Sequence, residues 1–173
     1  MDEATSAVKR TEVARRIADE LAGCGVKLVA SLPDNWISEL LQHLDGDGRF
    51  RHVAVNREES AIGLCSGAYM AGLGSAALMG ASGFMTCIYA ITKINYSYEI
   101  PLLLVMTLRG ALGDHHKHHI SNGLYLEPVL RAIDLPYVIV SRAEELGEIG
   151  RAYKHSRTFA RPTAVLLTRE LLR

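Results

Sequence analysis

Six short apolar runs, separated by segments of helical periodicity, are the feature of this 173-residue sequence that most restricts its fold. The run IPLLLVMT at 100–107 is the most apolar, which is typical of a strand buried on both faces of a sheet. Helical segments between such runs are the crossovers that a parallel sheet needs. We therefore predict a single α/β domain over residues 1–173, with an open, six-stranded, mainly parallel sheet covered by helices on both faces. The expected strands are 26–32, 52–55, 75–79, 100–107, 137–140 and 163–168, and the expected helices are 11–22, 36–44, 82–98, 125–133 and 143–158, with one more carrying Glu58 and Glu59 in its first turn.

Composition and charge argue against several classes of protein. Apolar residues make up 49% of the chain and charged residues 22%, as in ordinary globular domains. A net charge of zero does not suit a nucleic-acid partner, and no run approaches the ~20 apolar residues of a membrane span. Cys24, Cys65 and Cys87 have neither metal-ligand spacing nor a disulfide pattern, and the N-terminus shows no apolar core of a secretion signal. We therefore expect a cytoplasmic protein with no membrane or nucleic-acid contact.

Polar or glycine-bearing segments directly follow four of the expected strands. Ligands of open parallel sheets bind beyond the carboxyl ends of the strands, so these segments are the expected site. They are Ser31–Asn35, Asn56–Glu59, Gly80–Thr86 and Leu108–Gly123.

The stretch VNREESAIGLCSGAY at 55–69 places two carboxylates in the first turn of a helix. The helix dipole favours carboxylates there, so a solvated first turn is one interpretation. The stretch also resembles the glutamate helix in the pyrimidine-binding domain of thiamine diphosphate enzymes, which in the decarboxylase branch reads Arg-His-Glu-Gln, then small residues, then Gly-Tyr. In this register the family's glutamate falls on Glu59 and its Gly-Tyr pair on Ala68 and Tyr69.

The order and spacing of the motifs are similar to those of the small alpha subunits of sulfopyruvate and phosphonopyruvate decarboxylases. The resemblance implies that Glu59 hydrogen-bonds the pyrimidine ring of thiamine diphosphate and so activates the cofactor. A carboxyl suits this role when burial raises its pKa. Glu58 is then expected to be an exposed neighbour or a cap partner.

The first loop, SLPDNW at 31–36, resembles the family's Val-Pro-Asp turn, where an acidic or amide side chain faces the substrate. The register leaves open whether Asp34 or Asn35 takes this catalytic position. A helix N-cap by Asp34 is the alternative interpretation.

The third loop, GASGFMT at 80–86, resembles the family's Ser-Gly-x-Gly segment beside the aminopyrimidine. Two positions depart from that pattern, because Met85 stands where a second glycine is usual and Tyr89 lies near the place of an asparagine. A thioether fills irregular gaps, so Met85 can still support the bent cofactor. The expected cofactor contacts are Glu59, Gly80, Ser82, Gly83 and Met85.

The fourth loop contains GDHHKHHISNG at 113–123, with four of the seven histidines of the chain. A solvated loop and a metal site are two interpretations, although histidines so close together rarely converge on one ion. The third is a proton relay by His118 and His119, which resemble the His-His pair of pyruvate decarboxylases. Histidine is the residue type that most often serves such a relay. We predict the relay and no metal ligands. The basic side chains expected to bind or attract an anionic substrate are Arg109, His115, His116 and Lys117.

The triplet Gly46-Asp47-Gly48 matches the start of the family's diphosphate and magnesium motif, but no Asn pair follows it, so we predict a turn. The resemblance therefore implies that a beta subunit supplies the Mg²⁺ and diphosphate ligands in a hetero-oligomer. The expected activity, present only with that partner, is decarboxylation of sulfopyruvate or phosphonopyruvate to an aldehyde and carbon dioxide. The alternatives are a catalytically silent partner domain, another 2-oxo acid as substrate, and a nucleotide-binding domain, which the absence of a glycine-rich phosphate loop disfavours.

Overall fold

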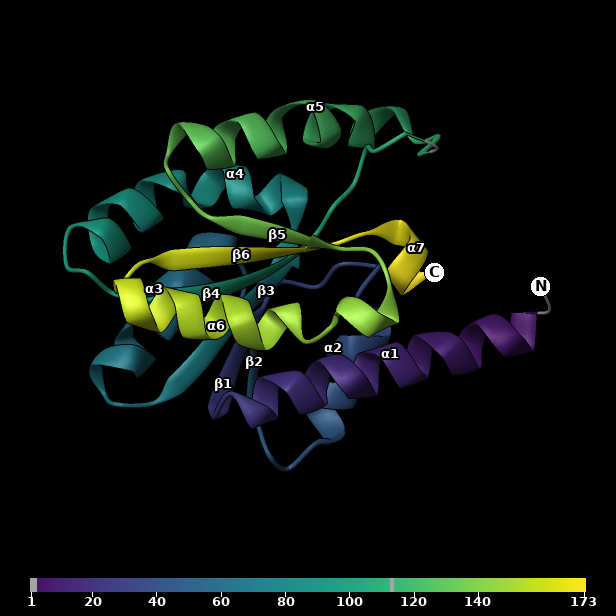
Figure 1. The fold of residues 1–173 in the computed structure, drawn as a ribbon, viewed down its shortest axis with the longest axis horizontal. Helices are drawn as coiled ribbons and strands as arrows, with labels where there is room; N and C mark the ends of the chain where they lie inside the picture. Colours follow the sequence, from purple (N-terminus) through teal and green to yellow (C-terminus); the bar gives the residue numbers. More distant parts are fainter. Residues whose placement is uncertain (1–2, 113) are drawn as a thin grey trace.

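The computed structural model describes residues 3–112 and 114–173, and in them six strands form one sheet with helices on both sides (Figure 1). The strand order is β2-β1-β3-β4-β6-β5, and every neighbouring pair is parallel. The predicted α/β class is confirmed, and the sheet is parallel throughout. The strands are β1 (Val26–Ser31), β2 (Arg51–Ala54), β3 (Gly74–Gly80), β4 (Leu102–Thr107), β5 (Tyr137–Val140) and β6 (Pro162–Leu167).

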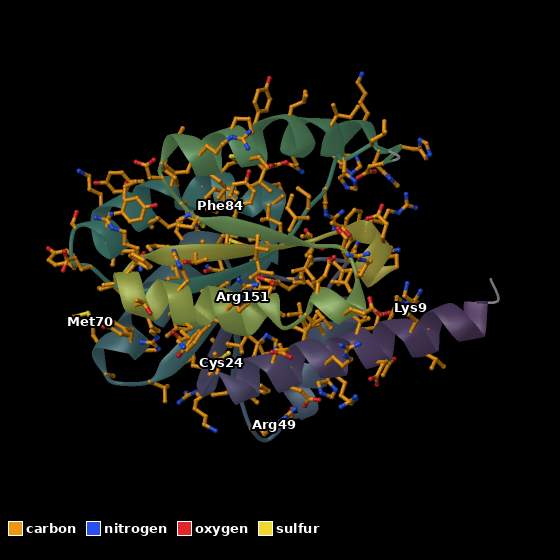
Figure 2. All side chains as sticks on the ribbon, in the orientation of Figure 1. Lys9, Cys24, Arg49, Met70, Phe84 and Arg151 are labelled. Atoms are coloured by element: carbon orange, nitrogen blue, oxygen red, sulfur yellow. The ribbon has the colours of Figure 1, made fainter. Side chains whose placement is uncertain are left out.

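The two faces of the sheet bury two separate apolar clusters. One lies under α1, α2, α6 and α7, and the other lies under α3, α4, η1 and α5. In the second cluster Phe84 of α4 is fully buried against the sheet (Figure 2). The helices are α1 (Glu3–Gly23), α2 (Ser38–Gly46), α3 (Glu58–Met70), α4 (Ala81–Ala90), η1 (Ile91–Tyr96), α5 (Lys117–Ala132), η2 (Ala143–Glu145), α6 (Glu148–Phe159) and α7 (Arg169–Leu172).

The central strand β4 connects the two clusters through the alternation of its side chains. Leu103 and Val105 belong to the first cluster, whereas Leu104 and Met106 belong to the second. All six residues of the strand are buried, as the apolar run at 100–107 predicts for the middle of a sheet.

Helix α5 begins earlier than its sequence predicts. The expected loop Leu108–Gly123 ends at His116, and the helix runs from Lys117 instead of Tyr125. The buried positions of α5 follow helical spacing, but two of them, His119 and Asn122, are polar, so an apolar pattern does not reveal this part of the helix. Pro128, which would fall in the first turn of the predicted helix 125–133, therefore lies inside α5.

The predicted helix 82–98 is divided in two. After α4 the chain continues as the π-helix η1, near the end of which Asn95 is fully buried. Its side-chain amide donates to Ser66 Oγ at 3.0 Å and to the carbonyl of Ile100 at 3.1 Å. The wider turn thus ties η1 to α3 and to the residues just before β4. The first predicted helix also differs, because α1 begins at Glu3 and not at residue 11.

Within the described ranges, none of the helices combines the length and apolar character needed to cross a membrane.

Candidate active site at the carboxyl end of the sheet

A cavity of about 320 Å³ lies beyond the carboxyl ends of β1, β3 and β4. Three of the four predicted loops contribute to it, together with the first turns of α5. This agrees with the rule that open parallel sheets bind their ligands at this edge. The lining residues are Pro33, Asp34, Asn35, Ser82, Arg109, His118, His119 and Asn122.

Arg109 is held by three side chains at the wall of this cavity. Its Nη2 donates to Asp34 Oδ1 at 2.6 Å, and its Nη1 donates to His119 Nε2 at 2.8 Å. The Trp36 ring lies 4.6 Å from the guanidinium carbon, close enough for a cation–π contact. The side chains of Arg109 and Asp34 are each only 12% exposed, so this ion pair is largely shielded from solvent.

Asp34, and not Asn35, is the residue of the first loop that faces Arg109. Asp34 Oδ1 also accepts the main-chain N–H of Trp36 at 2.8 Å and so closes the turn after β1. A Cβ on Gly80 would lie 2.6 Å from Asp34 Oδ2, so a larger residue at position 80 would displace the Asp34 carboxylate. Helix α2 has Ile37 at its N-cap, which means that the N-cap interpretation of Asp34 is wrong. Asn35 is exposed at the rim of the cavity.

The histidine-rich segment divides into one buried histidine and an exposed group. His119 is buried in the first turns of α5, whereas His118 is exposed but still lines the cavity. The remaining basic residues of the segment, His115, His116 and Lys117, are exposed and do not line it. Gly113 lies outside the described residues.

Asp114 is a functional candidate that the sequence analysis did not select. Its Oδ2 lies 2.8 Å from His119 Nδ1 and 3.0 Å from Gly110 N, and its Oδ1 accepts the N–H of His116 at 3.1 Å. Burial alone raises the pKa of Asp114, but the hydrogen bonds from Gly110, His116 and His119 outweigh it and hold the pKa well below its usual range. The only signal in the sequence is an aspartate directly before the histidine cluster.

Asp114, His116 and His119 lie close enough together to be considered as metal ligands, because one ligand atom of each lies within 4.8 Å of the others. However, Arg109 donates to Nε2 of His119, since a guanidinium has no acceptor. A metal ion on Nδ1 of a neutral imidazole would place a proton on Nε2, facing the arginine donor. The observed contacts therefore favour a proton, and not an ion, between His119 and Asp114.

The two glutamates at the start of α3 have different surroundings. The Glu59 carboxylate is 29% exposed and lies 3.0 Å from Arg57 Nη2. Hydrogen bonds from its own main-chain N–H and from Arg57 lower the pKa of Glu59, so this chain by itself does not give the raised pKa that we expected. Glu58 is not an exposed neighbour, because its side chain packs on Gly83, where an added Cβ would overlap the Glu58 carboxylate.

The other predicted cofactor contacts lie at the end of β3 and in the first turns of α4. Gly80 and Gly83 are buried, Ser82 is exposed, and Met85 is partly buried against the cluster under α3 and α4. Of these residues Gly83 contacts Glu58, whereas Ser82 lines the Arg109 cavity.

The Gly46-Asp47-Gly48 triplet forms the predicted turn between α2 and β2. Asp47 follows the last residue of α2 and accepts the N–H of Arg49 at 3.0 Å and its Nη2 at 2.6 Å. The triplet precedes β2, so it lies at the amino end of the sheet, opposite the cavity.

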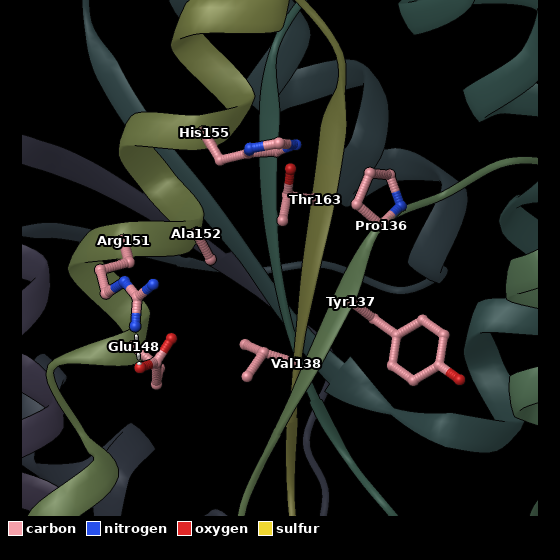
Figure 3. A pocket seen from close by; sticks show the side chains of 8 residues that line it. All are labelled: Pro136, Tyr137, Val138, Glu148, Arg151, Ala152, His155 and Thr163. Atoms are coloured by element: carbon pink, nitrogen blue, oxygen red, sulfur yellow. Dashed lines mark hydrogen bonds and ion pairs between the residues drawn. The ribbon is translucent and has the colours of Figure 1, made fainter.

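A second cavity, of about 290 Å³, lies between α6 and the amino ends of β5 and β6 (Figure 3). Arg151 and Glu148 form an ion pair at 2.6 Å on its α6 side, and Thr163 Oγ1 lacks a hydrogen-bond partner among the described residues. None of the predicted site residues lines this cavity.

Comparison with known proteins identifies a family and several relatives of this chain. The N-terminal TPP binding domain of thiamine pyrophosphate enzymes matches residues 11–128. The sulfopyruvate decarboxylase subunit alpha of Methanococcus maripaludis is 33% identical over 144 residues, which is 83% of this chain and 86% of that protein. The corresponding subunit of Methanocaldococcus jannaschii is 32% identical over 69% of this chain and 71% of its own.

More distant similarities extend to larger proteins. The phosphonopyruvate decarboxylase of Streptomyces viridochromogenes is 28% identical over 58% of this chain and 26% of its own length. In a solved structure, 2-oxoglutarate:ferredoxin oxidoreductase from Magnetococcus marinus, a region superimposes with a TM-score of 0.70 at 15% identity, covering 92% of this chain and 29% of that one. At this identity the superposition shows the fold alone. Because the family match covers more than half of the sequence, this chain belongs to the thiamine pyrophosphate enzymes, through their N-terminal TPP binding domain.

Proposed function

We propose that this chain is the pyrimidine-binding alpha subunit of a thiamine diphosphate-dependent decarboxylase acting on a 3-substituted pyruvate, either sulfopyruvate or phosphonopyruvate. The products are the corresponding aldehyde and carbon dioxide. The observation that carries the proposal is the cavity around Arg109, in a chain whose relatives at 32% and 33% identity are named sulfopyruvate decarboxylase subunit alpha.

The residues on α3 and after β3 fit the pyrimidine end of the cofactor. Glu59 presents a partly exposed carboxylate for a ring nitrogen, and Gly80 and Gly83 bring the main chain close to Asp34 and Glu58 without a Cβ. Ser82 and Met85 flank these glycines. When bound, thiamine diphosphate supplies the electron sink for loss of carbon dioxide.

A partner that covers Glu59 completes the site. It excludes water from the carboxyl, and this burial raises the pKa of Glu59 against the effect of Arg57. The surface beside Glu59 suits such a contact, because Gly63 and Gly67 are exposed on α3 and Tyr89 of α4 is 74% exposed. We assign the Mg²⁺ and diphosphate ligands to this beta subunit, in a cytoplasmic hetero-oligomer.

Arg109 is the proposed receptor for the anionic tail of the substrate. An arriving sulfonate or phosphonate displaces Asp34 from Nη2, while Nη1 stays on His119. Asp34 then has a free carboxylate within the cavity, where it holds or moves a proton together with His118. His119 takes part in proton transfer only when Arg109 releases its Nε2. Outside the cavity, His115, His116 and Lys117 add positive charge that attracts the substrate.

Co-expression with a beta chain that carries the diphosphate and magnesium motif tests this proposal. Decarboxylation of sulfopyruvate, phosphonopyruvate and pyruvate is measured with thiamine diphosphate and Mg²⁺, for the complex and for each chain alone. We expect only the complex to be active, with at least one 3-substituted acid preferred over pyruvate. Arg109→Gln should remove this preference, whereas Arg131→Gln, on the exposed side of α5, should keep it.

Two outcomes would contradict the proposal in different ways. An equal preference for pyruvate would support another 2-oxo acid as substrate. An inactive complex with bound cofactor would support a catalytically silent partner domain, the alternative suggested by Met85 in place of the family's second glycine.

A further inference from the structure

A continuous chain of four polar side chains leads from the histidine-rich segment to the first loop. Asp114 Oδ2 lies 2.8 Å from His119 Nδ1, His119 Nε2 lies 2.8 Å from Arg109 Nη1, and Arg109 Nη2 lies 2.6 Å from Asp34 Oδ1. The exposed fractions of these side chains are 4% for Asp114, 8% for His119 and 12% for Arg109 and Asp34. In such shielded surroundings a donor that faces another donor finds little water to bond instead, so the mismatch costs free energy. The direction of each hydrogen bond is therefore important.

The hydrogen bonds that link these four side chains have one consistent arrangement of donors and acceptors. A guanidinium only donates, so His119 Nε2 must be the acceptor from Arg109. The proton of the neutral imidazole is then on Nδ1, which donates to Asp114. Asp114 is itself fixed, since it also accepts the main-chain N–H groups of Gly110 and His116.

Gly110, which donates its N–H to Asp114, packs closely against the start of α5. Gly110 has a φ of +77°, a conformation that residues with a Cβ rarely adopt. A Cβ at this position would also overlap the carbonyl oxygen of His119. The main chain at Gly110 therefore lies directly against His119, where its N–H helps to hold the Asp114 carboxylate.

We propose that Asp114 is a positioning residue that holds His119 as the Nδ1–H tautomer and thereby aims the Arg109 guanidinium into the cavity. It acts through His119 and does not itself touch the substrate. The effect on substrate binding rests on the proposed function, whereas the tautomer of His119 is a property of this protein alone.

Asp114→Asn distinguishes the hydrogen-bonding role of Asp114 from the space that its side chain fills. Asparagine keeps the size of the side chain and, with its oxygen in the place of Oδ1, the hydrogen bond from the His116 N–H. Its amide group then stands in the place of Oδ2, where it donates to His119 Nδ1 and loses the hydrogen bond from the Gly110 N–H. This favours the Nε2–H tautomer, which then opposes the Arg109 donor, as replacing the aspartate of a catalytic triad by asparagine does. His116→Gln is the matched control, because it removes the neighbouring ring and leaves the His119–Asp114 contact in place.

Long-range ¹H–¹⁵N spectra of the full chain, with ¹⁵N-labelled histidine, distinguish the two tautomers at about pH 8, above the ordinary pKa of histidine. His119→Gln identifies the His119 signals among the seven histidines. We expect Nδ1–H in the wild type and in His116→Gln, and Nε2–H in Asp114→Asn. An Nε2–H signal in the wild type, or Nδ1–H in Asp114→Asn, overturns the proposal. If Asp114→Asn does not fold, Asp114→Ser replaces it, and loss of the single Nδ1–H signal is then the expected result.

The KM and kcat of the complex give a second test, because a purely structural role of Asp114 would not change KM selectively. In Asp114→Asn the Arg109 guanidinium is no longer held in position for the anionic acid. The KM for that acid should therefore rise about tenfold, with a smaller change in kcat. An unchanged KM together with a switched tautomer refutes the positioning role.

Two further outcomes separate this proposal from its rivals. If the tautomer result holds but the complex decarboxylates neither acid, the proposed function fails and the His119 assignment stands. If the wild type binds Zn²⁺ at micromolar concentration, and His116→Gln abolishes that binding, Asp114 serves a metal and the proposal is wrong.

Discussion

Two adjacent glutamates at the start of α3 differ in what their carboxylates contact. Glu59 faces Arg57 at the partly exposed start of the helix, whereas Glu58 packs on Gly83. The register of the family motif selects Glu59, and this assignment stays a prediction. The difference between the two carboxylates is not visible in the residue types, because either one is favoured at a helix N-terminus.

We expect Glu59→Gln to leave the fold intact and to lower kcat of the complex by about a thousandfold or more, since an amide cannot share a proton with the pyrimidine ring. Glu58→Gln is the matched control and should lower kcat much less. Steady-state decarboxylation by the two variants, with circular dichroism to confirm folding, measures the difference. Equal losses at the two positions would show that the register is wrong.

The residues of the cavity were predictable to different degrees. Arg109, His118 and the Asp34–Asn35 pair follow strands, and the rule for parallel sheets selects them from the sequence. The choice of Asp34 over Asn35 depends on its contact with Arg109, a residue 75 positions away, which no local pattern contains. Asp114 was missed for the same reason, because its role depends on the direction of hydrogen bonds.

At the scale of elements, strands were easier to predict than helix ends. A continuous apolar run such as 100–107 has one favourable environment, the buried sheet, so β4 was identified directly. The start of α5 was misplaced because His119 and Asn122 occupy its buried positions. A functional site built on a helix therefore obscures the periodicity by which the helix is recognised.

The proline inside α5 gives a prediction at this scale. Pro128 cannot donate the main-chain hydrogen bond of a helix interior, and it is exposed, so it contributes little packing. Pro128→Ala should raise the free energy of unfolding by about 1–3 kcal/mol, measured by urea denaturation. Ala132→Pro, in the last turn of the same helix, should lower it. An unchanged or lower stability of Pro128→Ala would mean that α5 is bent to fit the proline.

The turn between α2 and β2 predicts a dependence of stability on pH. Hydrogen bonds from Arg49 lower the pKa of Asp47 from 3.8 to about 2. The stabilisation is therefore present above pH 3.8 and is lost as the pH falls through about 2. Asp47→Asn should be less stable than the wild type at pH 6, and the difference should shrink between pH 4 and 2. Urea denaturation of both proteins at pH 6, 4 and 2 measures the difference, and a difference that does not shrink would contradict the prediction.

For the molecule as a whole, the sequence predicted the class and the number of strands, because the order of strands and helices defines a parallel sheet. It did not predict which loops meet across the sheet. Strand order decides that, and the order β2-β1-β3-β4 places the Glu59 loop and the Arg109 loop on opposite sides of β1 and β3.

The division of the site between two chains gives the prediction at this scale. The chain alone should bind thiamine diphosphate weakly or not at all, since the proposed diphosphate and Mg²⁺ ligands belong to the partner. Titration calorimetry of the isolated subunit, with and without Mg²⁺, measures this. Micromolar, Mg²⁺-dependent binding without a partner would contradict the two-subunit assignment.

The Arg109–Asp34 ion pair also bears on which anions the site admits. Asp34 is a competitor tethered inside the cavity, with an effective concentration on the order of millimolar or higher. If Arg109 receives the substrate, as we propose, every incoming anion has to displace Asp34. A small inorganic anion that contacts Arg109 alone would gain little by the exchange, whereas a 2-oxo acid would add contacts of its own to the cofactor. Under that proposal the Asp34 carboxylate acts as a filter that keeps abundant cellular anions from occupying the site.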